Sequence, residues 1–161
     1  VMNLGFLDID FLRWCFGPIK EVYAKGDKSG KEFFEYDLIT LGFEKGLIAH
    51  ITSDWSRPSC TPDYESLDIS GEIGTIKFES KDENTIEAIY GGEGCSCVKF
   101  ESPMDYLSNP VTKMLMAFID AIKSKGDMPV CPEDSMESLR ATLAVIESIE
   151  KNRPIAIEEV L

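Results

Sequence analysis

Few residues in this 161-residue sequence have side chains that could act in catalysis or metal binding, and they are far apart in the sequence. The single histidine, His50, stands between Ala49 and Ile51 in an apolar stretch. A nucleophile–histidine pair needs a histidine near a serine or cysteine, and a zinc site needs further nitrogen or sulfur ligands. We therefore interpret His50 as a hydrogen-bonded or interface histidine of a sheet. The alternative is a pocket role shared with another domain.

The paired aspartates and the cysteines are also best interpreted as structural residues. Asp8 and Asp10 are two residues apart on a predicted helix, where side chains do not face each other, so they do not form an acid/base pair. We interpret them as first-turn acids. The odd number of cysteines fits reduced structural thiols better than a disulfide framework or a metal site. These cysteines are Cys15, Cys60, Cys95, Cys97 and Cys131.

The loop at 56–64 is the best candidate for contacting a small ligand. It follows an apolar strand, contains two prolines and carries Arg57, Asp63 and Tyr64. Polar side chains on a stiff loop at the end of a sheet commonly line ligand pockets. Because any surface loop holds such residues, an ordinary loop remains the alternative.

Apolar periodicity predicts helices at about 4–16, 110–124 and 133–151. In the first and third helices, we expect the core-facing residues to be Leu4, Leu7, Phe11, Leu12, Met136, Leu139, Leu143, Ile146 and Ile149. The two tryptophans, Trp14 and Trp55, are interpreted as packing anchors.

Strands are predicted at about 18–25, 33–43, 47–56, 64–70, 75–80, 85–90 and 95–101, with a short last strand at 155–159. The order of elements indicates an α+β fold: an open, largely antiparallel mixed β-sheet with helices on one face, in a single domain over 1–161. No Gly-x-Gly-x-x-Gly follows a strand, so we predict no dinucleotide site in this chain.

The strand pair at 33–43 and 47–56 is apolar on both faces. Tyr36 and Leu38 alternate with Ile39, Leu41 and Phe43, which indicates that both faces are covered. Three helices can cover one face of the sheet. A second copy across a two-fold axis would cover the other, which predicts a homo-oligomer. The alternative cover is a part of the protein outside these residues.

Charge and hydropathy limit the classes of partner that this protein could bind. The formal net charge of −13 argues against nucleic acid, because phosphate binding needs a basic surface. No run approaches the roughly 18 apolar residues of a membrane span, and no signal segment opens the chain. We therefore expect a cytoplasmic protein that binds neither nucleic acid nor membrane.

Residues 2–17 read Met-Asn-Leu-Gly-Phe-Leu-Asp-Ile-Asp-Phe-Leu-Arg-Trp-Cys-Phe-Gly. This segment resembles the helix that opens the C-terminal domain of the Gfo/Idh/MocA oxidoreductases, with the pattern Asp-x-Gly-x-His-x-x-Asp-x-x-x-Trp-x-x-Gly. Further stretches similar to the family follow in order at 19–24, 41–49, 53–56, 69–78, 118–122 and 153–154.

The resemblance implies an NAD(P)-dependent enzyme acting on a sugar, polyol or related small metabolite. In this family an N-terminal Rossmann domain binds NAD or NADP. The C-terminal domain, similar to that of glyceraldehyde-3-phosphate dehydrogenase, supplies substrate contacts and often the oligomer interface through its sheet. The abrupt start inside a helix entry leads us to expect the C-terminal half of such an enzyme, inactive by itself.

The family's catalytic aspartate and histidine fall on Asn3 and Leu7, whereas its second aspartate is kept as Asp10. Neither replacement is an acid or a base, so we predict no catalytic residue in this chain. We expect Asn3, Leu7, Arg57 and Tyr64 nearest the substrate, with the proton carried by the absent domain's lysine, by water or by a group such as Tyr64. The alternatives are a non-catalytic family member that binds a sugar-like ligand or assembles, and a free-standing β-sheet interaction module.

Overall fold

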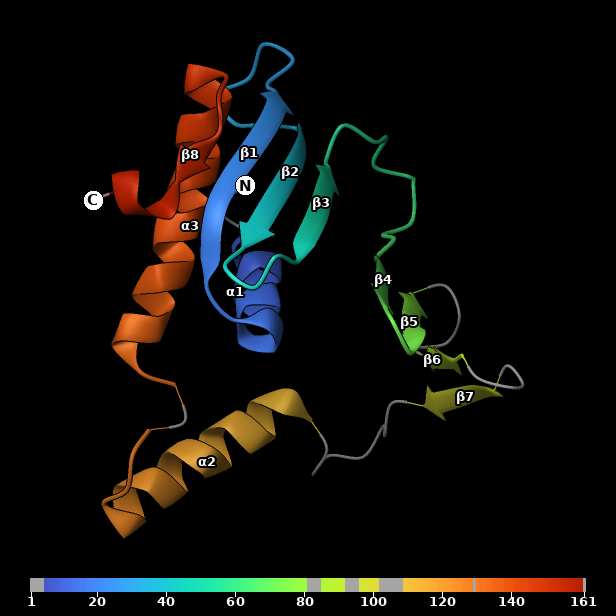
Figure 1. Cartoon of the computed structure of the whole chain (residues 1–161), viewed down its shortest axis with the longest axis vertical. Coiled ribbons are helices and arrows are strands. Elements are labelled where there is room, and N and C mark those ends of the chain that lie inside the picture. Colours follow the sequence, from blue (N-terminus) through green and yellow to red (C-terminus); the bar gives the residue numbers. More distant parts are fainter. Residues whose placement is uncertain (1–4, 81–84, 92–95, 102–108, 129, 161) are drawn as a thin grey trace. The chain divides into compact units, whose positions relative to one another are not determined.

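The computed structural model describes residues 5–80, 85–91, 96–101, 109–128 and 130–160. Contacts group the chain into two compact units (Figure 1). The first unit joins both ends of the sequence, Val1–Pro58 and Val130–Leu161, and the second is Ser59–Pro129. That residues 1–161 form a single domain stays a prediction.

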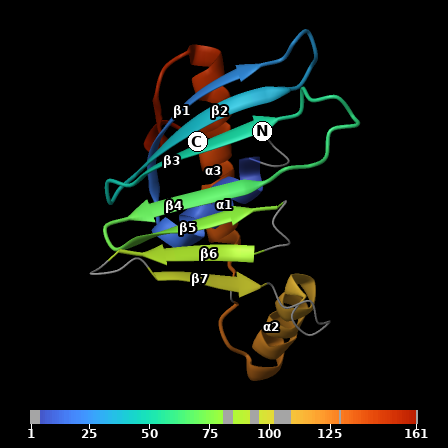
Figure 2. The ribbon, with the colours of Figure 1, turned by 90° about the vertical axis from the view of Figure 1, so that its right-hand side faces the viewer.

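The first unit is a four-stranded antiparallel sheet backed by two helices. Its elements are α1 (Gly5–Phe16), β1 (Ile19–Asp27), β2 (Tyr36–Phe43), β3 (Ile48–Asp54), α3 (Pro132–Lys151), β8 (Ile155–Ala156) and a 3-10 turn at Ile157–Glu159. The strand order in this first sheet is β3-β2-β1-β8. Figure 2 shows α1 and α3 on the same side of the sheet.

Strand alternation determines where the core of the first unit lies. Val22, Ile39 and Leu41 are fully buried on the side of the sheet that the helices cover. Ile9 and Leu12 of α1 and Val145 of α3 join the same cluster. An antiparallel sheet with one covered face shows this alternation. The predicted cover over the opposite face of these strands stays a prediction.

The predicted core faces of the helices are right only at some positions: Leu12 is buried and Ile149 packs against the core. Leu7, Phe11, Met136, Leu139 and Leu143 are all exposed. Helix α3 instead buries a face of small residues, Ser138, Ala141, Thr142, Ala144, Val145 and Ser148. Small side chains let a helix approach a sheet closely, so packing against β1 outweighs the bulkier stripe.

The Ser148 hydroxyl shows how close this approach is. It accepts a hydrogen bond from the backbone nitrogen of Ala24 (3.0 Å) and donates one to the carbonyl oxygen of Arg153 (2.7 Å). The interpretation of the tryptophans as packing anchors is also wrong, because Trp14 and Trp55 are 81% and 55% exposed. Both side chains therefore lie on the surface of the first unit.

The last predicted strand is shorter than expected. Only Ile155–Ala156 pairs with β1, and a 3-10 turn follows. The Glu159 carboxylate accepts a hydrogen bond from the backbone nitrogen of Ala156 (3.2 Å) and pairs with Arg153 (2.7 Å). These contacts draw the chain back on itself, so the strand ends after two residues.

The second unit contains the second sheet, with strand order β4-β5-β6-β7, and one helix. Its elements are β4 (Ser66–Gly71), β5 (Gly74–Glu79), β6 (Thr85–Tyr90), β7 (Ser96–Glu101) and α2 (Pro110–Ser124). A Cβ at Gly74 would lie 2.3 Å from the Ile89 carbonyl oxygen, so the hairpin needs glycine there. Asn109 caps α2 by accepting from the backbone nitrogens of Val111 and Thr112.

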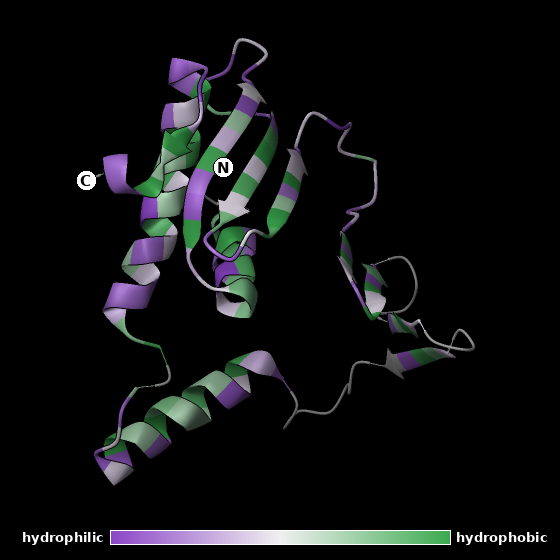
Figure 3. Ribbon diagram, in the orientation of Figure 1, coloured by the Kyte–Doolittle hydropathy of each residue, from purple (hydrophilic) through white to green (hydrophobic). Residues whose placement is uncertain are grey.

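Little of the second unit is buried. Of its described apolar residues, only Ala88 and Ala121 are buried. In Figure 3 much of the α2 ribbon has the green colour of hydrophobic residues. Its large exposed residues are Val111, Met114, Leu115, Met116, Phe118, Ile119 and Ile122.

The α+β fold class is confirmed, with three α-helices and antiparallel sheets among the described residues. The described strands pair as two sheets of four rather than as one continuous ladder. The segment from 55 to 65 that joins them contains Pro58 and Pro62. Proline lacks the N–H that a ladder requires, so this segment is suited to a loop.

Candidate functional site

The predicted substrate residues belong to different elements. Leu7 lies on the outer side of α1 and is 61% exposed, whereas Asn3 lies outside the described residues. Arg57 follows β3 in the first unit, and Tyr64 is an exposed residue of the second. Of the three that the structure describes, only Leu7 and Arg57 therefore belong to the same unit.

Arg57 is held by the end of β3. Its Nε donates to Asp54 Oδ2 at 3.2 Å. Asp54 Oδ1 also accepts from the backbone nitrogen and the hydroxyl of Ser56, at 3.0 and 2.6 Å. The Ser56 hydroxyl is the main cause of the lowered pKa of Asp54, and Arg57 adds to it. This Asx turn fixes the start of the loop, which supports the expectation of a rigid loop.

Sequence reasoning missed Asp37. This residue of β2 is 1% exposed on the helix-covered face, opposite Ser53 of β3. Burial raises the pKa of the Asp37 carboxyl, and hydrogen bonds from Ser53 act in the opposite direction. The available signal was its position in phase with Ile39 and Leu41, which places a carboxyl on the core side of an apolar strand. Buried carboxyls with raised pKa values are candidates for functional sites.

His50 is a sheet histidine, as the sequence indicated. It is exposed on β3, and its Nδ1 lies 3.1 Å from Thr40 Oγ1 on the neighbouring strand. Across the part of the chain that the structure describes, no group of three or more His, Cys, Asp or Glu side chains could hold a metal ion. The same residues include no helix long and apolar enough to cross a membrane.

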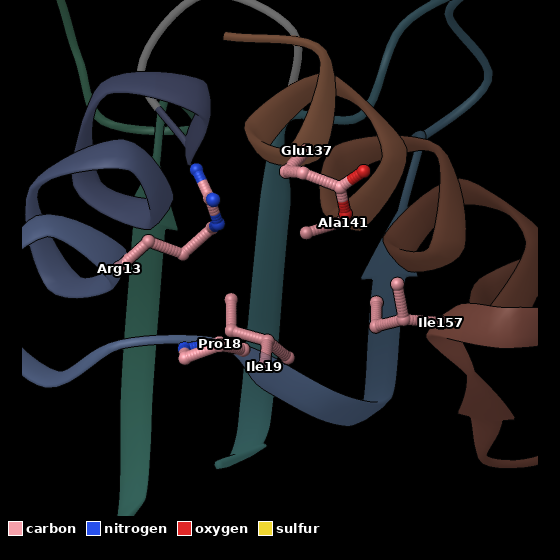
Figure 4. Close-up of a pocket in the computed structure, with 6 residues that line it drawn as sticks. All are labelled: Arg13, Pro18, Ile19, Glu137, Ala141 and Ile157. Carbon is pink, nitrogen blue, oxygen red and sulfur yellow. The ribbon is translucent and has the colours of Figure 1, made fainter. Parts of the chain in front are cut away.

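A cavity of about 250 Å³ lies between α1, α3 and the start of β1 (Figure 4). Its lining residues are Arg13, Pro18, Ile19, Glu137, Ala141 and Ile157. The Arg13 guanidinium is already bonded to Ser138 and Asp134. Ligand pockets usually measure about 300–1,000 Å³, so this cavity is smaller than a typical substrate site.

Of the glycine-rich segment at 91–94, only Gly91 lies within the described residues. The segment joins β6 to β7, and these strands pair with each other in antiparallel fashion. A phosphate cradle needs a helix N-terminus directly after such a turn. β6 is followed by a strand rather than by such a helix.

Comparison with known proteins places these features in a family context. Residues 1–77 match the model of the GFO/IDH/MocA C-terminal domain. The family resemblance is confirmed. The chain is also similar to the uncharacterized oxidoreductase YrbE of Bacillus subtilis (strain 168), with 25% identity over 168 residues. That alignment covers 98% of this chain and 48% of YrbE.

Solved oxidoreductase structures share the fold. One is an oxidoreductase from Agrobacterium radiobacter in complex with NAD⁺, L-tartaric acid and magnesium, with 19% identity and a TM-score of 0.80. The match covers 99% of this chain and 49% of that one. Levoglucosan dehydrogenase in complex with NADH gives 14% identity and a TM-score of 0.81, over 96% and 49% of the two chains. The chain thus spans about half the length of the curated relative and of the solved structures that it matches.

Proposed function

We propose that these residues form the substrate-binding and oligomerisation domain of an NAD(P)-dependent oxidoreductase that acts on a sugar, polyol or related small metabolite. The observation that carries the proposal is the agreement of nearly the whole chain with one half of cofactor-bound oxidoreductases. The names of those proteins, which include a sugar-derivative dehydrogenase and a complex with a hydroxy acid, support the substrate class. A cytoplasmic location is part of the same proposal.

The substrate would be bound by Asn3, Leu7, Arg57 and Tyr64. Asn3 offers an amide that can hydrogen-bond a hydroxyl, and exposed Leu7 offers an apolar contact. NAD or NADP would be held by a part of the protein outside these 161 residues and would supply hydride transfer. Because neither Asn3 nor Leu7 can accept a proton, the proton from the substrate hydroxyl would go to a lysine of that other part, to water or to a group such as Tyr64.

Oligomerisation would use the uncovered face of the first sheet. Tyr23, Tyr36, Leu38 and Ile48 are exposed there, opposite the face that α1 and α3 cover. Apolar residues on both faces of a sheet support a second covering layer, here a second copy.

Changing both Leu38 and Ile48 to glutamate is expected to reduce the oligomer to monomer in size-exclusion chromatography with light scattering. Lys45→Glu in the β2–β3 turn is the matched control. A wild-type monomer would contradict this part.

The function is tested with the full-length protein and a panel of sugars, polyols and hydroxy acids, with NAD(P)⁺ or NAD(P)H followed by absorbance. We expect cofactor-dependent oxidation or reduction of at least one compound by the full-length protein and none by the 161-residue chain.

The Asn3 and Leu7 replacements favour one second candidate, a non-catalytic ligand-binding or assembly protein. Cofactor binding without turnover across the panel would support that candidate. Absence of cofactor binding by the full-length protein would contradict the proposed oxidoreductase.

A further inference from the structure

Helix α1 is apolar on two opposite sides. At about 100° per residue, Leu7, Phe11 and Trp14 share one side and Ile9, Leu12 and Phe16 share the nearly opposite one. The structure buries Ile9 and Leu12 and leaves Leu7, Phe11 and Trp14 exposed. The exposed side includes the larger tryptophan, so apolar area alone does not explain why this side faces outward.

The polar flank of α1 distinguishes the two orientations. Arg13 Nη1 donates to Ser138 Oγ at 2.6 Å and to the carbonyl oxygen of Asp134 at 3.0 Å, while Nη2 donates to Asp134 Oδ1 at 3.2 Å. The Ser138 hydroxyl in turn donates to Asp10 Oδ1 at 2.5 Å. Ser138 is fully buried and the Arg13 side chain is 13% exposed. Figure 4 shows Arg13 reaching from α1 toward α3.

This network is compatible with only one of the two orientations. Asp10 and Arg13 are three residues apart and so lie on one flank of α1, between its apolar sides. Turning α1 by half a turn would bury Leu7 and Phe11 and would carry this flank away from α3. Ser138 would then be left buried without its charged partners, which is costly for a polar group.

We propose that Asp10, Arg13 and Ser138 are positioning residues that select which apolar side of α1 faces away from the core. The contribution to substrate binding rests on the proposed function, since Leu7 is on the selected outer side. The selection of the side does not rest on that function. It can therefore be tested in the 161-residue chain without any assay of turnover.

The test uses Trp14 as the reporter, in a Trp55→Phe background that leaves one tryptophan. With α1 as observed, Trp14 emission should resemble that of an exposed indole and acrylamide should quench it strongly. Ser138→Ala should shift the emission to the blue and lower the quenching constant about twofold or more, because most molecules would adopt the turned helix. Ser135→Ala, an exposed position of the same helix, should change neither quantity.

A merely stabilising network would give a different result. If Ser138→Ala is folded by circular dichroism but Trp14 emission and quenching are unchanged, the proposal is wrong. If Ser138→Ala does not fold, Arg13→Met is measured in the same way. Methionine is also a long, unbranched side chain, but it lacks the N–H donors of the guanidinium. Failure of both variants to fold, with Ser135→Ala folded, would also overturn the proposal. The network would then be needed for folding rather than for the choice of side.

Discussion

The two sheets have the same number of strands but differ in how they are covered. In the first sheet, Val22, Ile39 and Leu41 are fully buried beneath α1 and α3. In the second sheet, Ala88 is the only buried side chain among the described residues, and Ile76 is 42% exposed. The first sheet therefore has its own hydrophobic core within this chain, whereas the second sheet has little of one. Burial of apolar area is the main stabilising contribution to folding, so the two sheets should respond differently to the same substitution.

The largest expected difference is between matched isoleucines. Ile39→Ala in the first sheet should lower the free energy of unfolding by about 2–5 kcal/mol, because it opens a cavity in a closed core. Ile76→Ala in the second sheet should cost under about 1 kcal/mol, because the side chain is already partly in water. Urea unfolding followed by circular dichroism measures both, with hydrogen exchange of β2 and β5 amides to assign each loss to its sheet. Equal losses would remove the distinction between the sheets.

A smaller difference is expected between two serines. Ser148→Ala would leave the Ala24 N–H and the Arg153 carbonyl without their partner in the packed first unit, at a cost of about 1–3 kcal/mol. Ser70→Ala on the exposed surface of β4 should stay within about 0.5 kcal/mol. Thermal and urea unfolding of the two variants compare them directly. A Ser70 effect as large as that of Ser148 would show that the second sheet is equally closely packed.

The pH dependence of stability at Asp37 should also differ between the two sheets. Because burial raises its folded-state pKa above the unfolded value, the stability that Asp37 contributes is present at low pH and is lost as pH rises through the folded pKa. Asp37→Asn should therefore be more stable than the wild type at pH 7, with the gain vanishing near and below the ordinary carboxyl pKa of about 3.9. Asp68→Asn in the second sheet, where the carboxylate pairs with Lys77 at the surface, should give no gain at pH 7. A pH-independent effect of Asp37→Asn would contradict this account.

The smallest expected effect is at Glu159. Its pKa is lowered, mainly by the hydrogen bond from Arg153, so its contribution is present above the ordinary carboxyl pKa and is lost as pH falls through the folded pKa. Glu159→Gln should thus lower the melting temperature slightly at pH 7 and not at pH 3, the opposite sign to Asp37→Asn. Solvent and salt screen this exposed pair. A loss at pH 7 as large as that of Ser148→Ala would be inconsistent with a surface ion pair.

Local patterns predicted the elements of this fold well. The helices and strands lie close to their predicted ranges because period 3.6 and period 2 are properties of short segments. The helix faces were predicted only in part, because α1 is apolar on two sides and α3 packs mainly through small residues. The sequence does not show that Ser138 bonds Arg13 and Asp10 across more than 120 residues of chain. Such contacts exist only after the two ends of the first unit have come together.

Only part of the candidate site could be predicted. Arg57 was identified because a stiff polar loop follows an apolar strand, and the structure supplies its partner, Asp54. Asp37 was missed because a single carboxyl in an apolar strand can occur at an edge or on a wet face, and its burial depends on the packing around it. Asn3 and Leu7 were identified from the family pattern alone, and their contact with substrate stays a prediction.

Turnover by the full-length protein tests the central claim most directly. The comparison is between the full-length protein and the 161-residue chain, each given NAD(P)⁺ or NAD(P)H and the same sugars, polyols and hydroxy acids. We predict that the full-length protein oxidises or reduces at least one of them and that the 161-residue chain neither binds the cofactor nor turns over any substrate. Tight binding of the cofactor by the 161-residue chain, or a full-length protein that does not bind it, would contradict the account.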